Sequence, residues 1–127
     1  MRFLVMVKPN AAEIPRYEAG QFPESFPESL DRMGKFNETL TNDGMLVDMG
    51  GLQPTSHAVR IDYSGAKPII TDGPFAETKE QLAGYFLIEA KNLDEALKIA
   101  SRIPSAALGG SIEVRPVVMR TVEAAVS

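Results

Sequence analysis

The fold is decided by residues 82–103, which read LAGYFLIEAKNLDEALKIASRI. Residues 82–89 predict a strand, because the apolar and aromatic residues 85–88 form its centre. Asn92 precedes Glu95 by three residues, the spacing of a helix N-cap residue and its acidic partner. Pro104 then stops the helix. Its apolar stripe is expected at Leu93, Ala96, Leu97, Ala100 and Ile103.

The same order occurs nearer the N-terminus. The apolar residues 3–7 predict a strand that ends before Pro9. Ser25-Phe26-Pro27-Glu28 matches a capping box and opens a helix over residues 26–42, with Gly44 as a left-handed stop. A second strand follows at residues 45–49. The helix should bury the stripe Phe26, Leu30, Met33, Phe36 and Leu40.

The remaining elements complete a symmetrical plan. Residues 58–63 and 68–71 flank Ser64-Gly65 and predict a β-hairpin, and residues 111–118 predict the last strand. The order is therefore βαβ, an inserted hairpin, and βαβ again. We expect an α+β, ferredoxin-like fold, in which two helices cover one face of an antiparallel sheet.

Two strands of this sheet are apolar on both faces. Phe3, Val5 and Val7 alternate with Leu4 and Met6, and residues 85–88 repeat the pattern. A sheet with one wet face should instead alternate apolar and polar residues. Because two helices cover only one face, we expect the other face to be covered by a second copy, in an obligate homodimer.

Composition excludes several classes of function. The chain has 127 residues, 44% of them hydrophobic, with a net charge of −4, one histidine and no cysteine. The negative charge argues against binding to nucleic acid or to an anionic membrane. Without cysteine there is no disulfide, thiolate nucleophile or cysteine metal site. We expect a cytoplasmic protein with no membrane span, no metal and no cofactor.

Residues 72–81, DGPFAETKEQ, resemble the signature of the YCII-related proteins, in the branch called DGPF-domain proteins. The resemblance extends over nearly the whole chain, through residues 51–54, 84–88, 94–97 and 113–116. It implies a dimeric α+β barrel. We expect a single domain over residues 1–120, with residues 121–127 as a flexible tail. Some members are encoded beside extracytoplasmic-function sigma factors, which implies a regulatory setting. Better-studied relatives carry a His–Asp pair proposed as catalytic, and this pair does not carry over intact, because the single His57 stands in another context.

Two residues are candidates for catalysis. Asp72 fits a turn-capping role before Gly73-Pro74, and it equally fits a carboxylate base or ligand anchor. His57 is the only side chain with an unperturbed pKa near neutral pH, and a surface position without a role is its alternative. Glu77, Lys79 and Glu80 form either a solvated charge cluster or part of a polar pocket with Asp72. In the turn itself, Gly73 is expected to adopt a backbone conformation that is costly for other residues.

The last strand adds two candidate ligand-binding residues. Glu113 and Arg115 share one face of this strand and could line a cavity between subunits, while a cross-strand ion pair is the alternative. Three functions remain open. The chain could bind a small organic molecule near residues 72–80, serve as a regulatory or protein-interaction module, or run acid–base chemistry without a cofactor.

Overall fold

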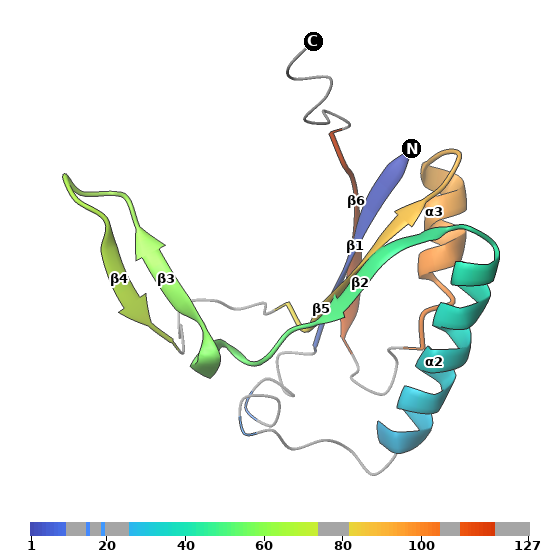
Figure 1. Ribbon diagram of the computed structural model, residues 1–127, viewed down its shortest axis with the longest axis horizontal. Helices are drawn as coiled ribbons and strands as arrows, with labels where there is room; N and C mark the ends of the chain where they lie inside the picture. Colours follow the sequence, from blue (N-terminus) through green and yellow to red (C-terminus); the bar gives the residue numbers. More distant parts are fainter. Residues whose placement is uncertain (10–14, 16–18, 20–25, 74–81, 105–109, 119–127) are drawn as a thin grey trace.

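The computed structural model describes residues 1–9, 15, 19, 26–73, 82–104 and 110–118. Four of its strands form one antiparallel sheet in the order β2-β5-β1-β6. This order confirms the α+β class and agrees with the expected ferredoxin-like plan (Figure 1). The strands are β1 (Arg2–Lys8), β2 (Leu46–Gly51), β5 (Gly84–Glu89) and β6 (Ser111–Pro116).

Both helices lie on one face of this sheet, as Figure 1 shows. Helix α2 spans Phe26–Asn42, the range that its periodicity predicts, and Gly44 follows with the left-handed φ of 71°. The predicted stop at Gly44 is therefore confirmed. The proposed capping residue Ser25 lies outside the described residues. Neither of these helices is long and apolar enough to span a membrane.

Helix α3, Leu93–Ala100, begins at the cap that the sequence indicates. The Asn92 side chain accepts a hydrogen bond from the Glu95 backbone N–H at 3.0 Å. The Glu95 carboxylate in turn accepts from the Lys91 N–H at 3.2 Å. These bonds satisfy donors that the first turn of a helix leaves unpaired.

The predicted apolar stripe of α3 is partly wrong. Leu93 and Leu97 are 45% and 47% exposed, whereas Ala96, Ile99 and Ala100 are buried. On a helix with 3.6 residues per turn, the direction shared by these buried residues lies well away from Leu97. The small side chains at 96 and 100 let the helix approach the sheet closely, and this approach brings Ile99 into the core in place of the two leucines.

The core lies between the helices and one face of the sheet. Phe3, Val5 and Val7 of β1 point into it, beside Phe86 and Ile88 of β5. Phe36 of α2 packs edge-on against Phe86, with ring centroids 6.1 Å apart. Leu40 is also buried there, and Met33 packs against the core from the same helix.

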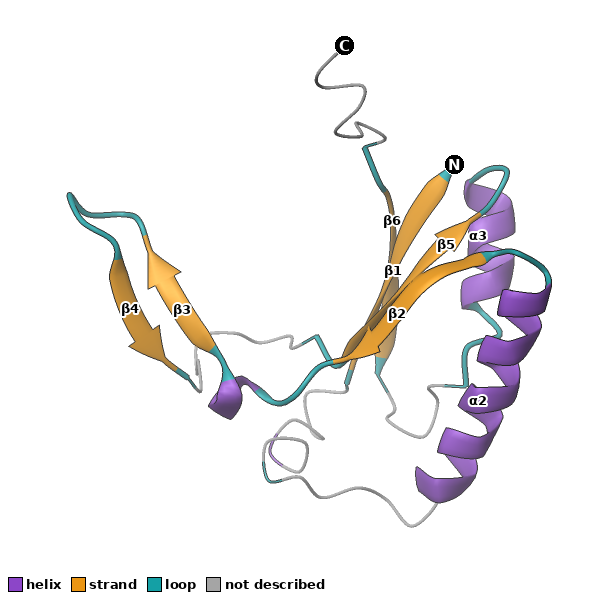
Figure 2. Cartoon of the chain, in the orientation of Figure 1, coloured by secondary structure: helices purple, strands orange, loops and turns teal. Residues whose placement is uncertain are grey.

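The other face of the sheet, which we call the open face, is not covered by either helix (Figure 2). The register places Leu4 and Met6 of β1 beside Leu87 and Tyr85 of β5 on this face. All four side chains are half-buried among their neighbours. The prediction that β1 and β5 are apolar on both faces is therefore confirmed. Phe3 and Phe86 face the helices, whereas Leu4 and Tyr85 lie on the open face.

The inserted segment forms a separate hairpin of β3 (Val59–Asp62) and β4 (Ile69–Asp72). In Figure 1 it stands on the side of the sheet opposite the helices. Every residue of both strands is exposed. Asp62 accepts a hydrogen bond from the Ser64 backbone N–H at 2.8 Å, which orders the connection between the strands.

Candidate functional site

A pocket of about 410 Å³ lies at the base of the hairpin, and we call it the base pocket. The chain leaves β2 through Leu52, whose N–H donates to the Ala83 carbonyl at 2.8 Å. It then forms a 3₁₀ turn at Thr55–His57 before entering β3. The hydrogen bond between Leu52 and Ala83 holds the chain before the hairpin next to the chain after it. The pocket is lined by Leu52, Gln53, Pro54, Thr55, His57, Ala58 and Leu82.

The composition of this lining suits a small organic molecule. Leu52, Pro54 and Leu82 supply apolar surface, while Gln53, Thr55 and His57 supply an amide, a hydroxyl and an imidazole. Small-molecule sites combine apolar walls with a few polar groups in this way. Histidine is also the residue type that acts most often as a general acid or base.

The signature turn packs directly on the wall of this pocket. Asp72 is the last residue of β4 and pairs with Val59. The next N–H, that of Gly73, donates to the Ala58 carbonyl at 2.8 Å. A Cβ built on Gly73 would lie 1.9 Å from the Thr55 carbonyl oxygen. Glycine is therefore required for close approach of two backbones.

The conformational reason expected for Gly73 is wrong. Among the described glycines only Gly44 has a positive φ, so Gly73 does not use the left-handed region. Substitution at Gly73 is costly because space is missing, and this lack of space arises where the 3₁₀ turn and the end of β4 meet. A contact between segments so far apart in the chain leaves no mark in the local sequence.

The sequence-predicted residues are brought together only in part. His57 lines the base pocket, and Asp72 lies one residue before the glycine that packs on its wall. Asp72 itself is exposed and does not line the pocket. Glu77, Lys79 and Glu80 lie outside the described residues. The turn-capping role of Asp72 stays a prediction.

Glu113 and Arg115 lie elsewhere, on the open face. The Lys8 ammonium donates to Glu113 Oε1 at 3.1 Å, and Arg115 Nη2 donates to Glu113 Oε2. A cross-strand ion pair is thus shown for Glu113, with Lys8 as its partner, whereas Arg115 pairs with Glu113 along the same strand. The ligand-binding role of Glu113 and Arg115 stays a prediction. The hydrogen bond from Lys8, followed by the one from Arg115, holds the pKa of Glu113 below its ordinary value.

A second polar group on the open face was missed by sequence reasoning. The Tyr85 hydroxyl donates to Asp48 Oδ2 at 3.2 Å. The charge of Asp48, and secondarily this hydrogen bond, raise the pKa of the Tyr85 phenol. The residues come from β5 and β2, so only the strand pairing could have revealed them. The same holds for Gln53 and Leu82 in the base pocket.

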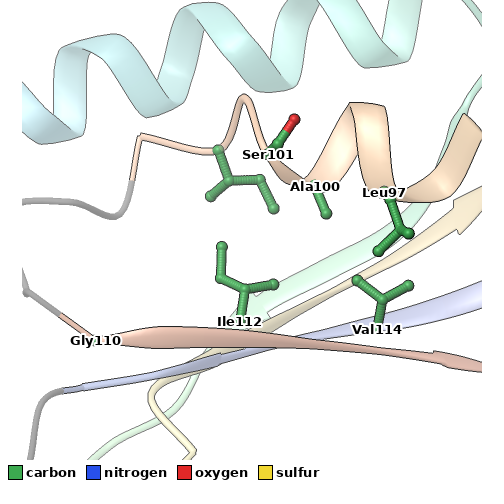
Figure 3. Close-up of a pocket in the computed structure, with 7 residues that line it drawn as sticks. Leu97, Ala100, Ser101, Gly110, Ile112 and Val114 are labelled. Atoms are coloured by element: carbon green, nitrogen blue, oxygen red, sulfur yellow. The ribbon is translucent and has the colours of Figure 1, made fainter. Parts of the chain in front are cut away.

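Two further hollows are lined by fewer polar side chains. A groove of about 420 Å³ runs between α3 and β6, where Ile112 and Val114 point toward Leu97 and Ala100 (Figure 3). Ser101 is its only polar side chain among the described residues. A smaller, almost wholly apolar hollow of about 270 Å³ lies beside Met33, Met49 and Tyr85. The base pocket has almost the same volume as the groove and is lined by an amide, a hydroxyl and an imidazole, so we consider it the candidate site.

Comparison with known proteins gives a consistent assignment. The family model of the YCII-related domain matches residues 1–120. An uncharacterised protein of Rhizobium meliloti (strain 1021) is 46% identical over 77 residues. The match spans 60% of this chain and 62% of that relative's length.

Proposed function

Because this chain belongs to the YCII-related domain family, we propose that it is a homodimer of the DGPF branch that binds a small organic molecule in the base pocket. The pocket carries the proposal. Its volume of about 410 Å³ falls within the range of about 300–1,000 Å³ that is usual for small-molecule sites. The ligand would have an apolar body and one or two polar groups that meet Gln53, Thr55 and His57.

The position of the signature supports a role in the same site. Gly73 is bonded to Ala58 of the pocket wall, and Leu82 is itself part of the wall. The described residues on either side of 74–81, Gly73 and Leu82, therefore both lie at the base pocket. We propose that Asp72, Glu77 and Lys79 meet the charged or polar end of the ligand, while the pocket holds its apolar body.

The dimer is supported by the open face. Leu4, Met6, Tyr85 and Leu87 form an apolar centre on the side that no helix covers. Around it, three cationic and three carboxylate side chains of the described residues offset one another, so two copies can meet there with little net repulsion, despite the charge of −4 on each chain. Glu113 and Arg115 would then line the space between subunits. The charged side chains are Arg2, Lys8 and Arg115, with Asp48, Glu89 and Glu113.

A second candidate function is acid–base catalysis without a cofactor. The observation that favours it is the position of His57 in the wall of the pocket. A general acid or base must lie within hydrogen-bond reach of the proton that it transfers. A ligand in the pocket would meet this imidazole, and a substrate that loses or gains a proton on carbon or oxygen would use it.

Thermal-shift measurements on the full chain test the binding site. The probes are small carboxylic acids, amides, phenols and amines, each with a compact apolar body. We expect one class to raise Tm, because a ligand at 100 times its Kd stabilises the folded state by about 2.7 kcal/mol. Gln53→Ala and His57→Ala should each reduce the shift. Lys67→Ala, in the exposed connection between β3 and β4, is the matched control.

The outcomes separate the two candidate functions. A compound whose shift depends on Gln53 and His57 and which is not altered on incubation supports binding alone. A compound that is converted, with the conversion lost in His57→Gln while binding remains, supports catalysis. If no class raises Tm, or if both pocket variants keep the full shift, the base pocket is not the site.

A further inference from the structure

The β3–β4 hairpin has two chemically different faces. Residues directly opposite each other in an antiparallel pair share a face, and the pairs here are Ile61 with Ile70 and Arg60 with Thr71. Val59, Ile61 and Ile70 therefore lie on one face, which Asp72 ends, and Arg60 and Thr71 lie on the other. That second face also holds Asp62 and the exposed Ile69, so it is mainly polar. The apolar side chains of Val59, Ile61 and Ile70 are 59%, 49% and 69% exposed in the single chain.

The alternation along β3 is typical of a strand with one buried side. Tyr63 continues the apolar parity just beyond β3 and is 72% exposed. An isolated two-stranded hairpin is marginal in water unless it packs against something else. Within the described residues the main sheet and the helices leave the apolar face of the hairpin bare, so the cover must come from elsewhere.

The position of the hairpin points to its cover. Figure 1 shows it on the side of the sheet opposite α2 and α3, which is the side of the open face. A molecule that lies on the open face would therefore also lie on the side toward which the hairpin projects. The two exposed apolar surfaces share one side of the protein, and one partner can cover both.

The area of the open face favours a partner that uses both surfaces. Strands about 4.8 Å apart with a rise of about 3.3 Å per residue give the four short strands a flat footprint of about 400 Å². Stable interfaces bury about 800 Å² on each partner. The sheet alone is therefore small for a stable dimer, and the hairpin adds apolar surface on the required side.

We infer that the hairpin is a dimerisation arm, which packs its Val59, Ile61 and Ile70 face against a second copy of this chain. The inference rests on the proposed dimer and goes beyond it, since it assigns the hairpin to the interface. In a two-fold dimer each copy gives one arm and receives one, so every favourable contact occurs twice. The balanced charges of the open face make a second copy a suitable occupant.

Sedimentation equilibrium over a concentration series tests the arm. Ile61→Lys with Ile70→Asp should raise the dimer Kd at least ten-fold, because two charged side chains would be buried in the interface. The two substitutions carry opposite charges because these residues are paired across the hairpin. The matched control is Thr71→Asp, next to Ile70 on the opposite face, which should leave Kd within two-fold. Both isoleucines are exposed in the single chain, so circular dichroism should show an unchanged fold.

The possible results separate failure of the proposed dimer from failure of the dimerisation arm. A parent chain that sediments as a monomer at micromolar concentration overturns the dimer and the arm together. A parent dimer whose Kd is unchanged in the isoleucine variant overturns the arm alone. Equal weakening by Thr71→Asp and by the isoleucine variant also overturns it, because the effect would then not belong to the apolar face.

A spin label gives a second test that needs no weakened variant. The chain has no cysteine, so Lys67→Cys offers a unique attachment point in the connection between β3 and β4. In mixed dimers of labelled chains and unmodified ¹⁵N-labelled chains, amide resonances of the ¹⁵N-labelled partner should broaden. If none broadens while the dimer persists, the arm does not reach the second copy. The apolar face of the hairpin would then be a contact surface for a different protein.

Discussion

Gly73 has no room for a side chain, since a Cβ would lie 1.9 Å from the Thr55 carbonyl oxygen. We expect Gly73→Ala to lower the free energy of unfolding by about 1–3 kcal/mol through overpacking. Gly34→Ala is the control, because Gly34 lies inside α2 with no atom within 4 Å of the added Cβ. It should stabilise by about 0.5–1 kcal/mol. Urea unfolding measures both, and equal stability of Gly73→Ala and the parent would contradict the close approach.

At the same scale, Glu113 sets a pH dependence on the open face. Its pKa is lowered by the hydrogen bonds from Lys8 and Arg115. The stabilisation is therefore fully present above the unfolded-state pKa of about 4.3 and is lost as pH falls through the lower folded-state pKa. Carboxyl NMR titration should show this pKa rising in Lys8→Met. Lys35→Met, which removes the partner of Asp31 on α2, should leave it unchanged.

Among the elements, α3 depends most on its cap, because Leu93–Ala100 is a short helix whose buried residues hold one side of the core. Asn92→Ala removes the hydrogen bond to the Glu95 N–H and should cost about 1 kcal/mol. Lys91→Ala should stay within about 0.5 kcal/mol of the parent, since that residue contributes its backbone N–H to the cap. Thermal unfolding of the two variants tests the difference, and an equal loss in both would exclude the cap as its cause.

For the whole molecule, the proposed dimer predicts that a charge on the open face separates the subunits. Leu87→Lys places an ammonium opposite Asp48, where a single chain tolerates it. In a dimer the same ammonium would be buried, so we expect a folded monomer in sedimentation velocity. Leu97→Lys puts the same group on the helix side, near the C-terminal end of α3, and should leave the assembly unchanged. A dimer in both variants would remove the open face from the interface.

Much of the fold could be predicted because its signals are local. The bounds of α2 follow from apolar spacing and from Gly44, and the start of α3 follows from Asn92 and Glu95. The two-faced β1 and β5 followed from simple alternation. The candidate site was predictable only at His57, whose residue type is unique in the chain. The residue types of Leu52, Gln53 and Leu82 recur elsewhere in the chain, so the sequence does not single these positions out.

The sequence by itself therefore determined the elements, their order and the apolar character of β1 and β5 on both faces. Helix and strand periods depend only on neighbours within a few residues. Only the tertiary structure decided that Leu93 and Leu97 stay outside the buried core, that Gly73 is needed for close approach and that the hairpin stands on the side of the open face. Each of these depends on the distance between segments far apart in the chain. That distance is set by how the helices, sheet and linkers pack, and no local pattern encodes it.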